Sequence, residues 1–266
     1  KILCFLLFFE VCFNGVGQIA SNAWASKSSS LNRYDEIMSE FTPLEDEEPF
    51  QRIEFADVKK NNGTQQYSFK GVTYYSSTMT ADAYNFFQAI GQPRYAKNVS
   101  VYYEQSDITN ALFGIRYVLT EKKTKQEDGT DKYDFTVTEN ENALSLAFLC
   151  SDEIKEFVLT DHEAGEDTLN ALWLSLTEND DAEFDEQVRA LQEKGMEITL
   201  FDTDRIEGRI TAGKESILMT TIPNDGGWKV YIDGEETEML KLASYFCGAV
   251  IPEGEHEIEF AYTVPG

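Results

Sequence analysis

The clearest pattern of hydrophobic and polar residues lies near the C-terminal end of the chain, over residues 215–264. Runs that are rich in β-branched and aromatic residues, or that alternate apolar with polar positions, are typical of strands. Four such runs cover residues 216–222, 228–232, 245–251 and 255–264. The turn-forming sequences PNDGG, DG and PEG lie between them. Several short strands at this spacing predict an antiparallel β-sandwich or jelly roll.

The same kind of pattern continues back towards the middle of the chain. Further strand-like runs cover residues 133–138, 143–150, 156–159, 169–176, 196–201 and 205–211. One helix is predicted among them, over residues 182–194, with an apolar stripe of Phe184, Val188 and Leu191. Asp181 is its predicted N-cap and Gly195 its end. We therefore expect residues 126–266 to form a β-sandwich-like domain with one inserted helix.

The first half of the chain alternates strand-like and helical patterns. Strand-like runs cover residues 50–55, 67–69, 71–76 and 115–120. A helix is predicted over residues 80–90, with Thr80 as N-cap, and a shorter one begins at a cap formed by Asp107 or Thr109. Residues 21–125 are thus predicted to form a small α/β subdomain with its connector, followed by a charged link over residues 122–132. The predicted fold class is α+β and mainly β.

The N-terminal stretch is strongly apolar. Between Ile2 and Phe13 the only polar residue is Glu10. Glu10, Asn14 and Gln18 recur every four residues, which places them on one face of a helix. We expect residues 1–20 to be the end of a transmembrane helix; the alternative is a secretory signal peptide with cleavage near Ala25. Either interpretation places the following residues outside the cytoplasm.

Charge and motifs exclude several classes of function. The chain has 22 Lys and Arg against 48 Asp and Glu, a net charge of −26, which repels the phosphates of nucleic acids. It contains no Gly-rich phosphate loop, no G-x-S-x-G and no H-E-x-x-H motif. None of the four cysteines forms a C-x-x-C pair, so no zinc site is predicted. The sequence therefore assigns no catalytic residue, metal or cofactor, and a disulfide between Cys150 and Cys247 is left open.

Two places carry groups that could contact a ligand. Ser76, Ser77 and Thr78 follow two tyrosines at a predicted strand-to-helix junction, where hydroxyls can bind a sugar or an anion. An ordinary loop is the more common outcome for such a sequence. Trp228 opens a predicted strand and could stack on a sugar ring, although a tryptophan in that position more often belongs to the core.

Several segments together resemble one protein family. They are GGWKVYIDG, the apolar run over residues 245–251 and PEGEHEIEFAY near the C-terminal end, with PFQRIEF, GVTYYSS and NALFGIRYVLT before them. In this order and spacing they resemble the extracellular region of the bacterial YfhO membrane-protein family. The resemblance covers nearly the whole chain, and the apolar start resembles the last transmembrane helix before that region.

The resemblance implies a role in glycosylation. Members are similar to the GT-C class of membrane glycosyltransferases and are linked to the decoration of lipoteichoic acid or related wall polymers with sugars from a polyprenyl-phosphate donor. The catalytic acidic residues of that class lie in loops that this chain does not contain. This chain is then expected to be a non-catalytic extracellular domain at the cell membrane, which meets the polyprenyl-phosphate sugar and the wall polymer through a separate membrane domain.

Under this interpretation, Ser76, Ser77, Thr78 and Asn85 are the predicted ligand-binding residues. Hydroxyls and an amide both donate and accept hydrogen bonds, as sugar hydroxyls do, and they add no charge that would repel a phosphate-bearing donor. The alternatives are a secreted carbohydrate-binding or adhesion module, and a purely structural domain of a membrane protein that transports rather than glycosylates.

Overall fold

The computed structural model describes residues 8–10, 12–13, 37–39, 49–56, 67–75, 79–92, 99–100, 105–159, 165–179 and 181–265. The chain divides into two units, Lys1–Leu44 and Glu45–Gly266. In the first unit all of the described residues are helical. No helix among the described residues is long and apolar enough to cross a membrane. Most of the helix predicted over residues 1–20 lies outside the described residues.

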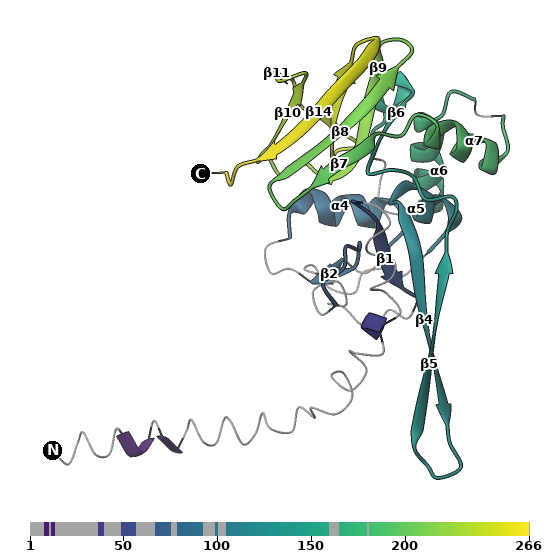
Figure 1. The fold of residues 1–266 in the computed structure, drawn as a ribbon, viewed down its shortest axis with the longest axis vertical. Helices are drawn as coiled ribbons and strands as arrows, with labels where there is room; N and C mark the ends of the chain where they lie inside the picture. The colour runs from purple at the N-terminus through teal and green to yellow at the C-terminus, as the bar shows by residue number, and fades with distance from the viewer. Residues whose placement is uncertain are drawn as a thin grey trace. The chain divides into compact units, whose positions relative to one another are not determined.

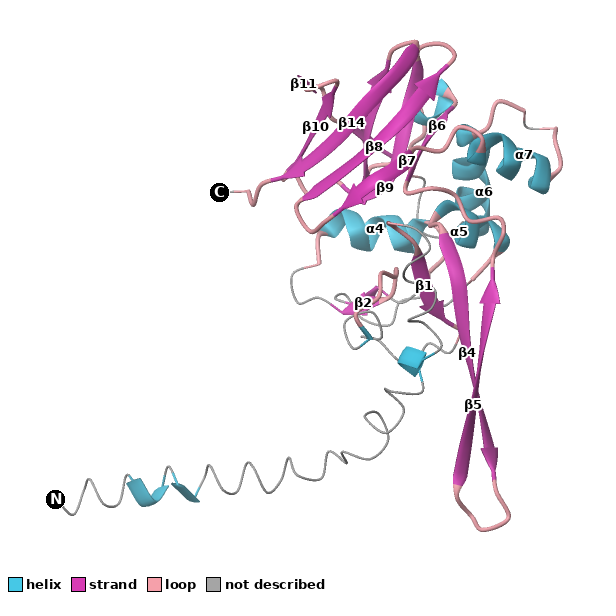
Figure 2. Ribbon diagram, in the orientation of Figure 1, coloured by secondary structure: helices cyan, strands magenta, loops and turns pink. Residues whose placement is uncertain are grey.

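The second unit is built around two antiparallel sheets (Figures 1 and 2). The first sheet has the order β11-β10-β14-β8-β7, with the strands Glu235–Thr237, Trp228–Ile232, Gly254–Tyr262, Arg205–Ala212 and Glu197–Phe201. The second has the order β12-β13-β9-β6, with the strands Leu240–Leu242, Phe246–Ile251, Ser216–Pro223 and Ala147–Cys150. The four strands predicted near the C-terminal end are therefore confirmed, and so is the mainly β, α+β fold class.

Alternation along the strands explains how the two sheets pack. In β14, Ile258 and Phe260 are buried, while the residues between and before them are more exposed. They join one apolar cluster with Val230 of β10 and with Leu218 and Ala249 of the second sheet. Because side chains alternate across a strand, each sheet sends every second residue into this shared core.

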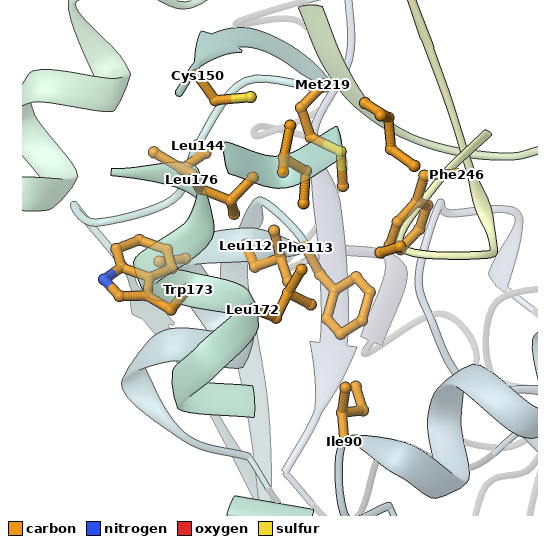
Figure 3. Close-up of a cluster of buried hydrophobic side chains, with 14 of the residues drawn as sticks. Ile90, Leu112, Phe113, Leu144, Cys150, Leu172, Trp173, Leu176, Met219 and Phe246 are labelled. Atoms are coloured by element: carbon orange, nitrogen blue, oxygen red, sulfur yellow. The ribbon is translucent and has the colours of Figure 1, made fainter. Parts of the chain in front are cut away.

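Strand β9 is buried on both faces. Leu218 and Ile222 point into the core between the sheets, whereas Ile217 and Met219 belong to a second apolar cluster. Helices cover that second face: α4 (Ala81–Ala89), α5 (Asp107–Leu112), α6 (Gly165–Leu176) and α7 (Phe184–Gln192). Figure 3 shows Met219 and Phe246 of the sheet facing the side chains of α5 and α6. The second sheet is thus a middle layer, which is why β9 is continuously buried from Ile217 to Ile222.

A smaller sheet joins the start of this unit to a long hairpin. Strand β1 (Arg52–Phe55) pairs in parallel with β4 (Ile115–Lys125), which pairs antiparallel with β5 (Asp131–Glu139). The hairpin extends away from the layers as a two-stranded ribbon (Figure 1). The charged link predicted over residues 122–132 is therefore wrong over most of its length, because those residues form the end of β4, the turn and the start of β5.

Several local predictions are corrected by the structure. The run at residues 169–176 is the end of helix α6, so in the described part of the chain two α-helices, α6 and α7, lie between β6 and β7 where one was predicted. Leu169, Leu172, Trp173 and Leu176 are buried, which is the helical spacing i, i+3, i+4, i+7. Residues 156–159 are not a strand; they follow the 3-10 helix η1 (Asp152–Lys155).

Other corrections concern helix ends and short elements. The cap of α5 is Ser106, whose hydroxyl accepts from the backbone of Thr109, and α7 begins after Glu183 without a side-chain cap. Residues 67–69 form no strand. The predicted strand over residues 71–76 shortens to β2 (Tyr74–Tyr75), paired with β3 (Val99–Ser100). By contrast, Thr80 caps α4 as predicted.

The two strand cysteines lie on opposite faces of the middle layer. Cys150 packs with the helices and Cys247 with the core between the sheets. Both are free thiols, so the open question of a disulfide between them is answered in the negative. Burial raises the pKa of Cys247 to about 12, so this thiol stays protonated at neutral pH. The division of the sequence at residue 125 stays a prediction.

Candidate functional site

Arg52 fastens the start of the second unit to the middle sheet. Its Nη1 donates to the carbonyl of Phe113 at 2.5 Å and to Oγ1 of Thr221 in β9 at 2.8 Å. Its Nη2 donates to the Thr221 carbonyl at 3.2 Å. Burial lowers the pKa of Arg52 to about 10, which still leaves it charged at neutral pH. One guanidinium therefore links β1, the end of α5 and β9.

Glu54, two residues later, is a buried acceptor. Its side chain is almost fully buried, and its Oε1 accepts hydrogen bonds from the backbone N–H of Val72 and, at 2.8 Å, of Thr73. Burial raises the pKa of the Glu54 carboxyl, although these hydrogen bonds and Arg52 oppose the shift. The carboxylate thus fixes residues 72–73 against β1 at an electrostatic cost.

We predict a specific pH dependence for Glu54→Gln. Since the pKa of Glu54 is raised in the folded state, its contribution favours the native state in acid and is lost as the pH rises through the folded pKa. Glutamine keeps an acceptor oxygen without the charge. Urea unfolding should therefore show the variant gaining stability relative to the wild type between pH 4 and pH 7.

Glu178→Gln serves as the control of opposite sign. Hydrogen bonds from Lys194 and Lys214 lower the pKa of the Glu178 carboxyl, so its contribution is present at neutral pH and is lost as the pH falls. This variant should lose relative stability over the same rise in pH. Parallel pH profiles for the two variants would contradict the assigned roles.

A cleft of about 620 Å³ lies beside this fastened segment. One wall is made by residues 49–51, which lead into β1, and another by Gly114 and Arg116 at the start of β4. The remaining lining comes from residues 143–146, which lead into β6, and from the end of α7 and the start of β7. The volume is within the usual range for small-molecule sites, and chain segments far apart in sequence form it.

Local backbone geometry brings these walls together. Gly114 has φ +60°, and a Cβ there would lie 2.5 Å from the carbonyl oxygen of Leu144. No other residue type fits that approach without a shift. On the opposite side, the Met196 N–H donates to the carbonyl of Ala147 at 2.8 Å, which holds the start of β7 beside β6.

The polar groups of the cleft are held by hydrogen bonds. Gln192 Nε2 donates to the carbonyls of Glu141 at 2.7 Å and Ala143 at 3.2 Å. The Ser145 hydroxyl donates to the Met196 carbonyl at 2.8 Å. Arg116 lies 2.7 Å from Glu139 in an ion pair at the half-exposed edge. These contacts orient the groups before any ligand arrives, which limits the entropy lost on binding.

Phe50 is a wall of the cleft and is itself closely packed. Its ring centroid lies 4.7 Å from that of Phe201, and the Arg52 guanidinium carbon lies 4.9 Å from it. Lys70 also approaches this ring pair, with its Nζ 4.9 Å from the Phe201 centroid. Since these neighbours already pack on the ring, Phe50 shapes the cleft and does not offer a free stacking platform.

The residues predicted to bind a ligand are elsewhere. Ser76, Ser77 and Thr78 lie outside the described residues. Asn85 is exposed on α4 and does not line the cleft. Trp228 is half-buried against the core between the sheets, with its ring 5.0 Å from that of Tyr262. Packing rather than ligand stacking therefore accounts for Trp228.

No sequence pattern indicated the cleft, although two of the segments that line it stand out in the sequence. PFQ at residues 49–51 and GIR at residues 114–116 belong to the segments that carry the family resemblance. Polar residues at the ends of elements, such as Gln192 and Arg116, gave no periodic pattern. Within the described part of the chain, no three His, Cys, Asp or Glu side chains gather as metal ligands would.

Comparison with known proteins identifies a family. A family model described as bacterial membrane protein YfhO matches residues 1–181 and 162–266. No curated protein and no solved structure matches the chain. The two matched ranges overlap and together span the whole sequence, so they include every segment that lines the cleft.

Proposed function

Because the chain belongs to the YfhO family of bacterial membrane proteins, we propose that it is the extracellular, non-catalytic part of a membrane glycosyltransferase similar to the GT-C class. In this role it takes part in glycosylating lipoteichoic acid or a related wall polymer with a sugar from a polyprenyl-phosphate donor. The family match favours this proposal over a secreted carbohydrate-binding module.

One observation supports this role for the domain. Two of the segments that resemble the family are distant in sequence, and both line the same preorganised cleft. Residues 49–51 and the pair Gly114 and Arg116 form adjoining walls, and Arg52 fastens the first wall to β9. A cleft with oriented amide, hydroxyl and charged groups suits a polar ligand such as a carbohydrate. We propose that it holds part of the polymer while transfer takes place in the membrane domain.

A second proposed contact involves Ser76, Ser77, Thr78 and Asn85. Asn85 is exposed on the helix that Thr80 caps, so its amide is accessible to a ligand. We propose that the hydroxyls preceding this helix and the Asn85 amide position the donor or acceptor. In the predicted division of the chain, they belong to the part (residues 21–125) that follows the N-terminal membrane segment.

The test uses the full-length membrane protein in a strain that lacks its gene. The wild-type protein should restore sugar on the wall polymer. A variant with Ser76, Ser77 and Thr78 replaced by alanine should restore less, at equal protein abundance in the membrane. The measurement is the sugar content of the purified polymer.

A matched control replaces three exposed hydroxyl residues of the β4–β5 hairpin, Thr124, Thr136 and Thr138, with alanine. This variant should restore the wild-type sugar content. Full activity of the first triple variant would reject the role of residues 76–78. If the wild-type protein itself does not change polymer glycosylation, the proposed function is wrong.

A further inference from the structure

The hydrogen bonds inside the cleft leave mainly acceptor atoms for a ligand. Gln192 Nε2 is bonded to two carbonyls, so the Oε1 atom of this amide is left to accept. The Ser145 hydroxyl donates its hydrogen bond to the Met196 carbonyl, so only its oxygen lone pairs remain to bind a ligand. Both atoms therefore call for a ligand that donates hydrogen bonds.

The charges in the cleft also disfavour a ligand that is a negatively charged acceptor. Glu197 is exposed on β7 and lines the cleft, and it forms no ion pair with any described residue. Arg116 is the one cation among the described lining residues, and Glu139 neutralises it at 2.7 Å. Arg52 and Lys70 also lie near the Phe50 wall, at 4.9 and 5.8 Å from its ring, so Glu197 and the net charge of −26 are what oppose an anion entering the cleft.

These two observations separate the ligands that a wall polymer or its donor could present. A phosphate group at neutral pH is negative and accepts hydrogen bonds, so it needs cations and donors. A sugar hydroxyl carries no charge and both donates and accepts, so it can bond to Gln192 and Ser145 and still accept from an Arg116 N–H.

We propose that the cleft binds an uncharged sugar through its hydroxyl groups and discriminates against phosphate. This inference rests on the proposed function for the source of the sugar. It assigns to the cleft the sugar on the polymer chain rather than its phosphates or the phosphate of the polyprenyl donor. Glu197 then determines specificity, because it makes the cleft repel anions.

The test is a binding titration of the full 266-residue chain in uncharged detergent, followed by backbone amide NMR. The probes are the methyl glycosides of glucose, galactose and N-acetylglucosamine, together with glucose 1-phosphate and ethanolamine. At least one methyl glycoside should shift the amides of residues 143–146 and 192–198 at millimolar concentration. At low salt, glucose 1-phosphate should bind at least about tenfold more weakly than the methyl glycoside. This difference in affinity should decrease as salt is added, because salt screens the repulsion.

One variant and its control test whether the Glu197 carboxylate causes the discrimination against phosphate. Glu197→Gln should strengthen the binding of glucose 1-phosphate several-fold and leave the methyl glycoside nearly unchanged. The control, Glu235→Gln, removes an exposed charge on β11 outside the cleft. It should keep the wild-type difference in affinity between the methyl glycoside and glucose 1-phosphate. If Glu197→Gln leaves this difference in affinity unchanged, Glu197 does not determine the specificity of the cleft.

Any one of three results would overturn the inference as a whole. No methyl glycoside shifts the amide signals of the residues that line the cleft, glucose 1-phosphate binds as tightly as the methyl glycosides, or ethanolamine displaces the bound methyl glycoside. These outcomes are separate from a failure of the proposed function. Normal polymer glycosylation without the gene would remove the biological role and leave the measured sugar binding intact.

Discussion

Phe86→Ala is expected to lower the free energy of unfolding by about 3–5 kcal/mol, a large fraction of the stability of a typical domain. Phe86 is fully buried on α4. Its ring centroid lies 5.1 Å from that of Tyr245 and 4.8 Å from that of Phe246, both next to or within β13. Truncation would leave a cavity where the helix layer meets the middle sheet, and those rings cannot close it without moving the strand.

The measurement is equilibrium unfolding in urea, followed by tryptophan fluorescence and circular dichroism. Asn85→Ala is the matched control, because it changes the neighbouring exposed position on the same helix. It should shift the free energy of unfolding by no more than about 0.5 kcal/mol. Similar stabilities of the two variants would mean that α4 does not depend on the Phe86 contact.

Arg52→Ala is expected to cost about 3 kcal/mol and to open the cleft. Hydrogen bonds from a charged donor contribute more than neutral ones, and their loss leaves the carbonyls of Phe113 and Thr221 with fewer donors. The same change loosens the wall formed by residues 49–51, because it removes the side-chain hydrogen bonds from the next residue to Thr221, while Phe50 keeps its packing against Phe201. Binding of a methyl glycoside should weaken together with stability.

Arg52→Lys should give an intermediate result. A single ammonium lacks the planar fork that reaches Phe113 and Thr221 together, so some of the hydrogen bonds are lost. The control is Arg209→Ala, whose guanidinium is largely exposed and lies 3.8 Å from Glu257. That variant should stay within about 0.5 kcal/mol of the wild type. If Arg52→Ala unfolds at the wild-type urea concentration, Arg52 does not fasten the segment.

The local pattern of hydrophobic and polar residues predicted an element correctly where one face of that element is exposed to solvent. The run at residues 228–232 alternates, and the structure has β10 over the same residues. The helix predicted over residues 80–90, with Thr80 as its cap, matches α4 to within one residue at each end. In these cases the residues next to one another in sequence already determine the element, because cap, period and stop are local signals.

Pattern was misleading where apolar residues lie on an exposed face or where pairing is distant. The exposed face of α6 carries the apolar residues Ala171 and Leu174, so residues 169–176 form a short apolar run that resembled a strand. The charges of residues 122–132 predicted a link, yet Lys123 and Asp131 are paired at 2.8 Å across a hairpin. Cross-strand pairing satisfies such residues on a solvated ribbon, and nothing in their local sequence announces the partner.

The sequence by itself determined the strands of the C-terminal module, the capped helix α4, the strong negative charge and the family to which the chain belongs. Only the tertiary structure decided that β9 forms a middle layer, that Cys150 and Cys247 face apart, and that residues 49–51, 114–116, 143–146 and 192–198 enclose one cleft. The physical reason is that caps, turns and alternation act between near neighbours. A cleft depends on contacts such as that of Arg52 with Thr221, which lies 169 residues away.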